Sequence, residues 1–446
     1  MRSLIFAWGL CSTLMLTSLA APPALGGSRR GPPPRYFVDE TKLPFEALPG
    51  ATAHWGTHKR AGFRAEVPDD WNGSLVVWAH GFRGTGLELT VDNHPLRALL
   101  IPLGFAWASS SYSRNGWDVK AGVQDTHALV KRFDELVGHP QRVYLTGAEM
   151  GGHAAAVSIE QYPIYDAALA VCGSLADHAL FDYFLDFNAA AQQLGTGTSA
   201  FPVDPVQYIG LTVPQIKANL EAFPGGWPIF LNAGGENQKN LTALRSGGFR
   251  PNFDEGWFFW NTFPSFATGP GNFLFDLGTG VGGVPIGAVD NADTVYQFDS
   301  DPSLTPDEQA LNDGIVRVSA DPKARRSKGL SKLPAVSGDI DVPVLTLHNL
   351  GDLFVPVHNE IEYASRVLAQ GKSDFLVQRA IRGVGHCDFS AAEFSTAFLD
   401  LVAWLESGVK PGGDDWLDPA NVADPLFGCT YTDDPGGGHL LATPCP

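Results

Sequence analysis

The chain has 446 residues, of which 44% are hydrophobic and 17% are charged. That hydrophobic fraction is enough for a large core, so a generally disordered chain is excluded. The formal net charge of −18 disfavours nucleic acid and an anionic membrane surface as partners. The 50 Gly and 33 Pro indicate many loops and turns, which disfavours a helical bundle or a coiled coil.

Residues 1–26 have the pattern of a signal peptide. Arg2 precedes an apolar run from Leu4 to Leu19, and small residues follow from Ala20 to Gly27. The apolar run is short for a membrane span, although an uncleaved anchor stays as the alternative. We therefore expect a secreted protein, extracellular or periplasmic, that has no membrane attachment once the signal is cleaved.

The cysteines predict two disulfides. Cys11 lies in the predicted signal, so four cysteines remain in an oxidising compartment. Cys429 and Cys445 bracket a Gly/Pro-rich tail, which favours a local bridge there. Cys172 and Cys387 are then left for each other, with two unlinked buried thiols as the alternative. We find no CxxC or His/Cys spacing that suggests zinc.

Apolar runs and helical periodicities alternate along the chain after a Pro-rich segment at 27–50. We predict strands at 75–79, 105–108, 143–145, 167–171, 342–347 and 375–377. We predict helices at 118–137, 151–162, 359–369 and 391–405. This alternation implies an α/β fold, with a mostly parallel sheet and helices on both faces. The core would comprise 51–172 and 339–406, followed by a disulfide-bonded tail at 407–446.

Residues 173–338 interrupt this alternation and are too many for an ordinary loop. We predict that they form a large cap inserted over the sheet. The segment contains an aromatic cluster that consists of Trp257-Phe258-Phe259-Trp260, Phe263 and Phe266. These rings would form a small core within the cap, or an apolar wall that faces a ligand, and both roles stay open.

Four short motifs follow predicted strands, in a set order. They are His80-Gly81-Phe82, Thr146-Gly147-Ala148-Glu149-Met150-Gly151-Gly152, Asn349-Leu350-Gly351-Asp352 and Gly383-Val384-Gly385-His386. In this order the chain resembles an α/β-hydrolase, and more closely the secreted bacterial esterase-like members. The resemblance covers most of residues 60–406 outside the cap.

The second motif resembles the nucleophile elbow of that family, Gly-x-Ser-x-Gly. Gly147 and Gly151 match the flanking glycines, but Glu149 stands at the serine position. No other Gly-x-Ser-x-Gly occurs in the chain. The family's order of nucleophile, acid and histidine places Asp352 and His386 with Glu149 as the candidate catalytic residues.

The resemblance also implies a role for each neighbour of these residues. Asp352 would hold His386 in one tautomer and stabilise its imidazolium form. The backbone N–H groups of Phe82 and Met150 would form the oxyanion hole. We interpret His80 as a structural support of that loop. A Cys172–Cys387 bridge would lie at the carboxyl edge of the sheet and constrain the histidine loop.

Glu149 leaves several kinds of chemistry open. Family members with Asp at this position, the epoxide hydrolases and haloalkane dehalogenases, attack a saturated carbon, and the histidine then activates water. Arg83 departs from the epoxide-hydrolase pattern, which has Pro there, and Met150 from the dehalogenases, which have Trp. Three cap tyrosines are candidates for protonating an opening epoxide, although packing is the commoner role: Tyr183, Tyr208 and Tyr296.

Three other interpretations of Glu149 stay open. It could be a general base at an ester or lactone carbonyl, with a pKa lowered by the helix N-terminus and by cationic His386. The site could bind a ligand without catalysis. Glu149 could also replace the serine of a serine esterase.

The combined prediction is a secreted hydrolase that acts on an apolar small molecule or oligomer of the ester, lactone or epoxide type. Glu149 would be its nucleophile or base, and the His386–Asp352 pair would activate water. The alternative is a ligand-binding protein on a hydrolase scaffold. No metal or organic cofactor is implied by the sequence.

Overall fold

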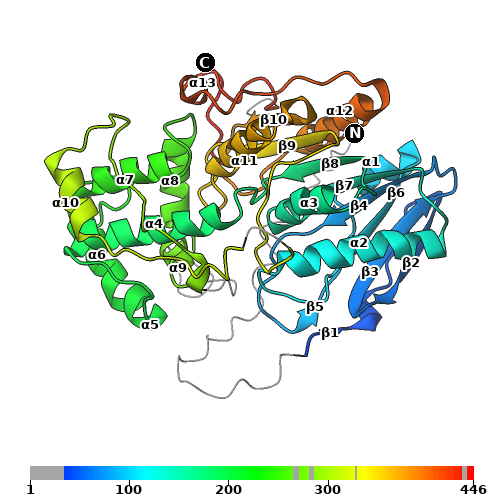
Figure 1. Cartoon of the computed structure of the whole chain (residues 1–446), viewed down its shortest axis with the longest axis horizontal. Coiled ribbons are helices and arrows are strands. Elements are labelled where there is room, and N and C mark those ends of the chain that lie inside the picture. Colours follow the sequence, from blue (N-terminus) through cyan, green and yellow to red (C-terminus); the bar gives the residue numbers. More distant parts are fainter. Residues whose placement is uncertain (1–34, 265–270, 281–285, 327–328, 434–438) are drawn as a thin grey trace, which may run out of the picture.

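The computed structural model describes residues 35–264, 271–280, 286–326, 329–433 and 439–446 (Figure 1). The predicted signal peptide and Phe266 lie outside these ranges. Within them, no helix has both the length and the apolarity needed to cross a membrane.

The core of the protein is an eight-stranded sheet in the order β10-β9-β8-β7-β4-β6-β3-β2. Its strands are β2 Ala51–His58, β3 Ala61–Pro68, β4 Ser74–Ala79, β6 Ala106–Ser110, β7 Arg142–Ala148, β8 Ala167–Val171, β9 Val344–Asn349 and β10 Leu376–Ile381. The six strands from β10 to β6 pair in parallel, and β3 pairs antiparallel with both β6 and β2. The predicted fold class is therefore confirmed.

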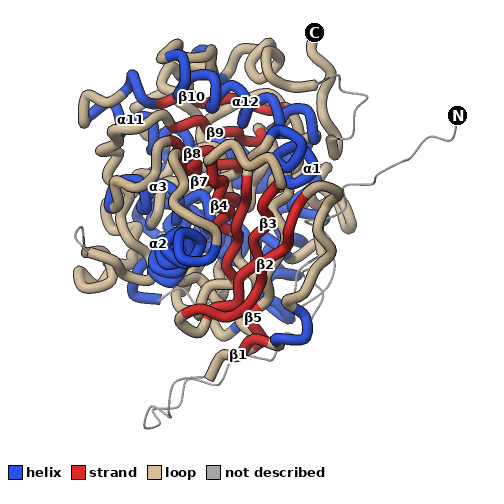
Figure 2. Tube along the Cα trace, turned by 90° about the vertical axis from the view of Figure 1, so that its right-hand side faces the viewer, coloured by secondary structure: helices blue, strands red, loops and turns tan. Residues whose placement is uncertain are grey.

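Helices cover both faces of this sheet (Figure 2). Helices α2 Val119–Leu136, α3 Met150–Gln161 and α11 His358–Ala369 lie on one face, and α1 Arg97–Leu100 and α12 Ala391–Ser407 on the other. Successive strand residues point to opposite faces, so Leu75 and Val77 pack in the first core, and Val76 and Trp78 in the second. This two-sided burial explains why the core strands are continuous apolar runs.

The antiparallel edge was not predicted from the sequence. In β2 the side chains alternate between exposed and half-buried, so no apolar run marks the strand. A second, two-stranded sheet, which pairs β1 Phe37–Val38 with β5 Glu88–Leu89, is too short to leave a pattern.

Between β8 and β9 the chain forms a mostly helical unit, at the left of Figure 1. Its helices are α4 His178–Thr196, α5 Pro205–Gln207, α6 Val213–Leu220, α7 Ala233–Arg245, α8 Phe253–Thr262, α9 Phe273–Leu277 and α10 Pro306–Gly314, with a π-helical turn at Tyr208–Thr212. Helix α4 is buried along most of its length, and the ring of Phe187 on it contacts Trp257 and Phe275. We refer to this unit as the cap.

After α12 the chain continues as a tail, whose described residues include a short helix, α13 Pro419–Val422. Its Cys429–Cys445 disulfide forms as predicted. Arg382, just after β10, donates to the carbonyls of Phe427 and Pro444 at 3.1 and 3.2 Å. The tail therefore packs against the edge strand β10. Short 3₁₀ turns complete the described elements: Glu40–Lys42, Ile101–Leu103, Ile286–Ala288 and Ser373–Phe375.

Candidate active site

Glu149 lies at a sharp turn between β7 and α3, with φ of 54° and ψ of −117°. The turn is crowded by backbone atoms on both sides. A Cβ at Gly147 would lie 2.2 Å from the carbonyl oxygen of Gly151, and a Cβ at Gly151 would lie 2.0 Å from that of Ala79. Only glycine fits at these two positions, and this requirement explains the Gly-x-Glu-x-Gly spacing.

The two carboxylate oxygens of Glu149 have different environments. Oε2 accepts a 2.6 Å hydrogen bond from the backbone N–H of Phe82, whereas Oε1 is buried without a hydrogen-bond partner. The residue is only 5% exposed. Oε2 is therefore bound by one of the two N–H groups predicted for the oxyanion hole, that of Phe82, and Oε1 is the free oxygen.

Gly81 makes room for this arrangement, a role that we did not predict. A Cβ there would lie 2.2 Å from Oε2 of Glu149 and 3.1 Å from its Cβ. Any larger residue would displace the carboxylate from the N–H of Phe82. The signal available in the sequence was the glycine of the His80-Gly81-Phe82 motif.

His386 and Asp352 form the predicted pair. His386 Nδ1 lies 2.7 Å from Asp352 Oδ2, and Asp352 Oδ1 accepts from the backbone N–H groups of Phe354 and Val355 at 2.8 and 3.0 Å. Because the carboxylate accepts at both oxygens, the ring proton of His386 belongs on Nδ1. Nε2 is then the basic nitrogen of the ring.

Burial raises the pKa of Glu149, while the charge of His386 and the N–H groups of Phe82 and Met150 oppose the rise. The expectation of a lowered pKa is therefore wrong in direction, because the helix N-terminus and the imidazolium do not offset desolvation. Burial alone would lower the pKa of His386, but Asp352 and, more weakly, Glu149 raise it above its ordinary value. The two groups thus influence each other's charge.

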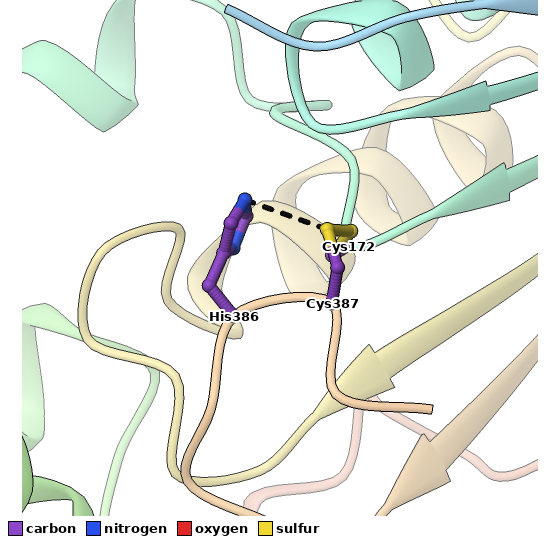
Figure 3. A group of neighbouring side chains, drawn as sticks. All are labelled: Cys172, His386 and Cys387. Atoms are coloured by element: carbon purple, nitrogen blue, oxygen red, sulfur yellow. Dashed lines mark hydrogen bonds between the residues drawn. A yellow bond between two sulfur atoms is a disulfide. The ribbon is translucent and has the colours of Figure 1, made fainter. Parts of the chain in front are cut away.

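The Cys172–Cys387 disulfide joins β8 to the histidine loop and spans 215 residues of sequence. Figure 3 shows the sulfur of Cys387 beside the imidazole, with 3.5 Å between Sγ and Nε2 of His386. These three residues are also a group of potential metal ligands. Metal binding requires thiolates, and the disulfide removes both, so the oxidised donor set does not suit a metal.

His80 has the surroundings of a packing residue in the loop that carries Phe82. Its ring is buried and stacks on Tyr112 at 3.8 Å, and Nδ1 lies 2.6 Å from the carbonyl oxygen of Gly81. Burial keeps its pKa well below the ordinary value. A neutral, stacked imidazole of this kind holds the loop in place.

Hydroxyls of the three candidate tyrosines all make packing hydrogen bonds. Tyr208 donates to Asn188 and Tyr296 donates to Asp186, both within the cap. Tyr183 donates to the carbonyl of Leu353 at 3.3 Å. Of the three tyrosines it is therefore the one that contacts the acid loop, by which we mean the segment after β9 that carries Asp352.

The described rings of the aromatic cluster differ in their surroundings. Trp257 packs inside the cap, whereas Phe258 is 40% exposed. Trp260 faces the core and contacts Phe354, whose ring edge meets His386 at 4.9 Å between centroids. An apolar wall therefore adjoins the imidazole, and Phe354, which we did not single out, supplies it.

A scan against known protein-family models finds no match. A curated relative, the o-phthalyl amidase of Xanthobacter agilis, is 23% identical over 407 residues, which are 79% of this chain and 86% of the amidase.

Solved structures with distant similarity include two from Aspergillus oryzae. An esterase has a TM-score of 0.48 and 15% identity, with 82% of each chain covered. Feruloyl esterase B has a TM-score of 0.46 and 16% identity, with 81% of this chain and 80% of the other covered. A bacterial heroin esterase has a TM-score of 0.40 and 14% identity over 81% of this chain and 86% of its own.

We base the fold assignment on the structure of the chain itself. A mostly parallel sheet carries a strand–elbow–helix turn at Glu149, and an acid and a histidine follow it in the order Asp352, His386. By strand order, elbow and order of these residues, the chain is an α/β-hydrolase in fold.

Proposed function

We propose that the protein is a hydrolase in which the Glu149 carboxylate is the nucleophile, and that its substrates are apolar molecules with an electrophilic carbon. The difference between the two carboxylate oxygens carries the proposal. Oε2 is bound by the Phe82 N–H, and Oε1 is free and buried. A nucleophile needs one oxygen fixed for orientation and one available for attack.

In the first step Oε1 attacks the substrate carbon and a glutamyl ester forms. The bond from that carbon to its leaving oxygen breaks, and the oxygen takes the electron pair and then a proton from solvent water. A strained epoxide suits this step, because opening of the ring releases its strain. Attack at an ester carbonyl suits it less, because the carboxylate is a much weaker base than the alkoxide that it would have to expel. An ester or lactone would react at its alkyl carbon.

In the second step water cleaves the glutamyl ester. His386 Nε2 takes a proton from water, whose oxygen attacks the Cδ of Glu149. The negative charge that develops is then on Oε2, which already accepts from the Phe82 N–H. Asp352 at 2.7 Å supports the imidazolium that forms. The Cδ–Oε1 bond then breaks, Oε1 leaves with the product as its hydroxyl oxygen and takes the proton from His386, and the carboxylate is regenerated with one oxygen from water after its remaining proton passes to solvent.

A second candidate, hydrolysis at an ester or amide carbonyl, is favoured by the similarity to the amidase. A substrate carbonyl would need the N–H of Phe82, which Oε2 of Glu149 occupies. This reaction therefore requires the Glu149 side chain to leave the hole and act as a general base. The same occupied hole suits the third possibility, a ligand-binding protein.

Turnover in ¹⁸O-labelled water distinguishes these three. The panel would contain aryl epoxides, lactones, p-nitrophenyl esters and N-acyl amides. A nucleophilic Glu149 incorporates ¹⁸O into its own carboxylate, which peptide mass spectrometry detects, and His386→Gln accumulates an adduct on Glu149. Turnover without label in Glu149 would favour the general base. Absence of turnover, adduct and label across the panel would contradict the proposal and favour the binding protein.

We also propose that the protein is secreted. The N-terminal pattern and the two disulfides support this location. Mass spectrometry of the mature protein from culture medium or periplasm tests it, with cleavage after Ala20 or after Gly26 as the expected result.

A further inference from the structure

One tryptophan of the cap contacts both loops that carry the candidate residues. Trp260 on α8 is buried, and its indole N–H lies 3.1 Å from the carbonyl oxygen of Gly351 and 2.9 Å from that of Val384. Gly351 immediately precedes Asp352, and Val384 is two residues before His386. A single N–H from the cap therefore joins the acid loop to the histidine loop.

Two other cap residues, Gly256 and Arg250, contact the acid loop just before Asp352. Helix α8 approaches so closely that a Cβ at Gly256 would lie 2.3 Å from the carbonyl oxygen of Gly351. The guanidinium of buried Arg250 donates to the carbonyl of Leu350 at 2.7 Å. Two consecutive carbonyls before Asp352 thus receive their hydrogen bonds from the cap.

The ring of Phe354 lies between the indole ring of Trp260 and the imidazole of His386 and contacts both. Trp260 and Phe354 have ring centroids 6.2 Å apart, and Phe354 meets His386 edge-to-face at 4.9 Å. The backbone N–H of Phe354 also donates to Asp352. Phe354 therefore touches both members of the pair and is itself backed by Trp260.

We propose that Trp260 is a positioning residue through which the cap sets the alignment of His386 with Asp352. The two loops leave neighbouring strands, β9 and β10, and direct bonds also join them, from the Gly351 N–H to the Gly383 carbonyl at 2.8 Å and between the Asn349 side chain and the backbone of Asp388 at 2.8 and 2.9 Å. Loss of the indole N–H would leave two buried carbonyls without that donor, so the loops would loosen without separating. The consequence for catalysis rests on the proposed function, but the alignment itself does not.

The same helix supplies a matched control. Trp257 is also buried, and its indole N–H donates to the carbonyl of Pro228 at 3.0 Å, within the cap. Trp257→Phe and Trp260→Phe each remove one indole N–H from one helix and leave an aromatic ring. Only Trp260→Phe removes a bond to the loops of the candidate site.

Proton NMR of the full-length protein tests this inference without a substrate. The Nδ1 proton of His386, identified by its loss in His386→Gln, should give a low-field signal. In Trp260→Phe we expect that signal to weaken, and the pKa of His386 to move from its raised value toward 6.5 as the Asp352 contact loosens. Trp257→Phe should leave both unchanged.

If a substrate is found, kcat should fall about tenfold in Trp260→Phe with KM nearly constant.

Equal changes in the Trp257→Phe and Trp260→Phe variants, or no change in Trp260→Phe, would overturn the inference. Circular dichroism and the unfolding midpoint report whether each variant is folded. Should Trp260→Phe unfold, Trp260→His, which keeps a ring N–H, replaces it and should restore the low-field signal; its failure to do so counts against the role of the N–H. A wild-type protein without any turnover would refute the proposed function and leave the NMR comparison intact.

Discussion

The two halves of the candidate site are held in place by different means. On the Glu149 side the constraint is local backbone packing, since Gly81, Gly147 and Gly151 each lie against atoms that a Cβ would meet within 2.2 Å. On the His386 side the constraint comes from distant segments, through the Cys172–Cys387 disulfide and the bonds of Trp260. We conclude that the elbow is intolerant of added atoms, whereas the histidine loop depends on long-range connections.

The largest expected effect is loss of the long-range disulfide. The double variant Cys172→Ala/Cys387→Ala opens a connection across 215 residues, for which chain entropy predicts a loss of about 5 kcal/mol of unfolding free energy. Urea denaturation measures it. The low-field signal of His386 should weaken as well, because its loop is released. An unchanged signal would show that the cap alone holds the loop.

Gly151→Ala tests the packing of the elbow. The new Cβ would lie 2.0 Å from a backbone carbonyl oxygen that cannot move independently, so we expect a loss of 3 kcal/mol or more, roughly the upper range for overpacking. Gly210→Ala is the control, because a Cβ there meets no atom within 4 Å. Similar unfolding free energies for the two variants would remove the contrast between the halves of the site.

Removal of the tail disulfide, Cys429–Cys445, should lower the stability of the protein more than it disturbs the candidate site. Cys429→Ala/Cys445→Ala opens a connection of only 16 residues, for which chain entropy predicts a loss of about 3 kcal/mol. The bridge itself lies outside the candidate site, although Leu440 of the tail accepts from the Val384 N–H and donates to Asp388, so the signal and pKa of His386 should change less than on loss of Cys172–Cys387. A loss of the His386 signal here would mean that the tail, too, aligns the pair.

The smallest effect concerns the charge of Glu149. Its pKa is raised in the folded state, so its contribution to stability is complete below the unfolded value of 4.5 and is lost as pH rises through the folded pKa. Glu149→Gln does not titrate. Its unfolding free energy should match the wild type below pH 4.5 and exceed it by about 1 kcal/mol at pH 8, a typical size for one substitution.

Most of the parallel core was predictable because each buried strand is a short apolar run and each helix has a 3.6-residue period. The predicted helix at 118–137 is Val119–Leu136 in the structure, capped by the Asp118 side chain. The antiparallel strands were missed for two reasons: the residues of β2 are half-buried or exposed, and in β3, which is mostly buried, Arg64 and Glu66 interrupt the apolar run. Boundaries differ by one to four residues, as at β10, which extends beyond 377 to Ile381.

For the site, the sequence indicated which residues to examine but not their environments. The sequence showed the order of Glu149, Asp352 and His386 along the chain. In the structure Asp352 and His386 are in contact, and Oε2 of Glu149 accepts a hydrogen bond from the backbone N–H of Phe82. The direction of the Glu149 pKa shift was wrong because burial cannot be seen in a motif. Gly81, Trp260 and Phe354 were not assigned their roles.

By itself the sequence determined the alternation of strands and helices and the glycine spacing of the elbow, and it favoured the pairing of the cysteines that the structure shows. The first two follow from local periodicity and from steric rules, which act within a few residues. The third follows from the even number of cysteines outside the predicted signal peptide. Only the tertiary structure decided that one oxygen of Glu149 is bound and the other free, and that the cap contacts both loops that carry the candidate residues Asp352 and His386. Those features depend on atoms from segments 67 to 124 residues apart, and no local pattern records such distances.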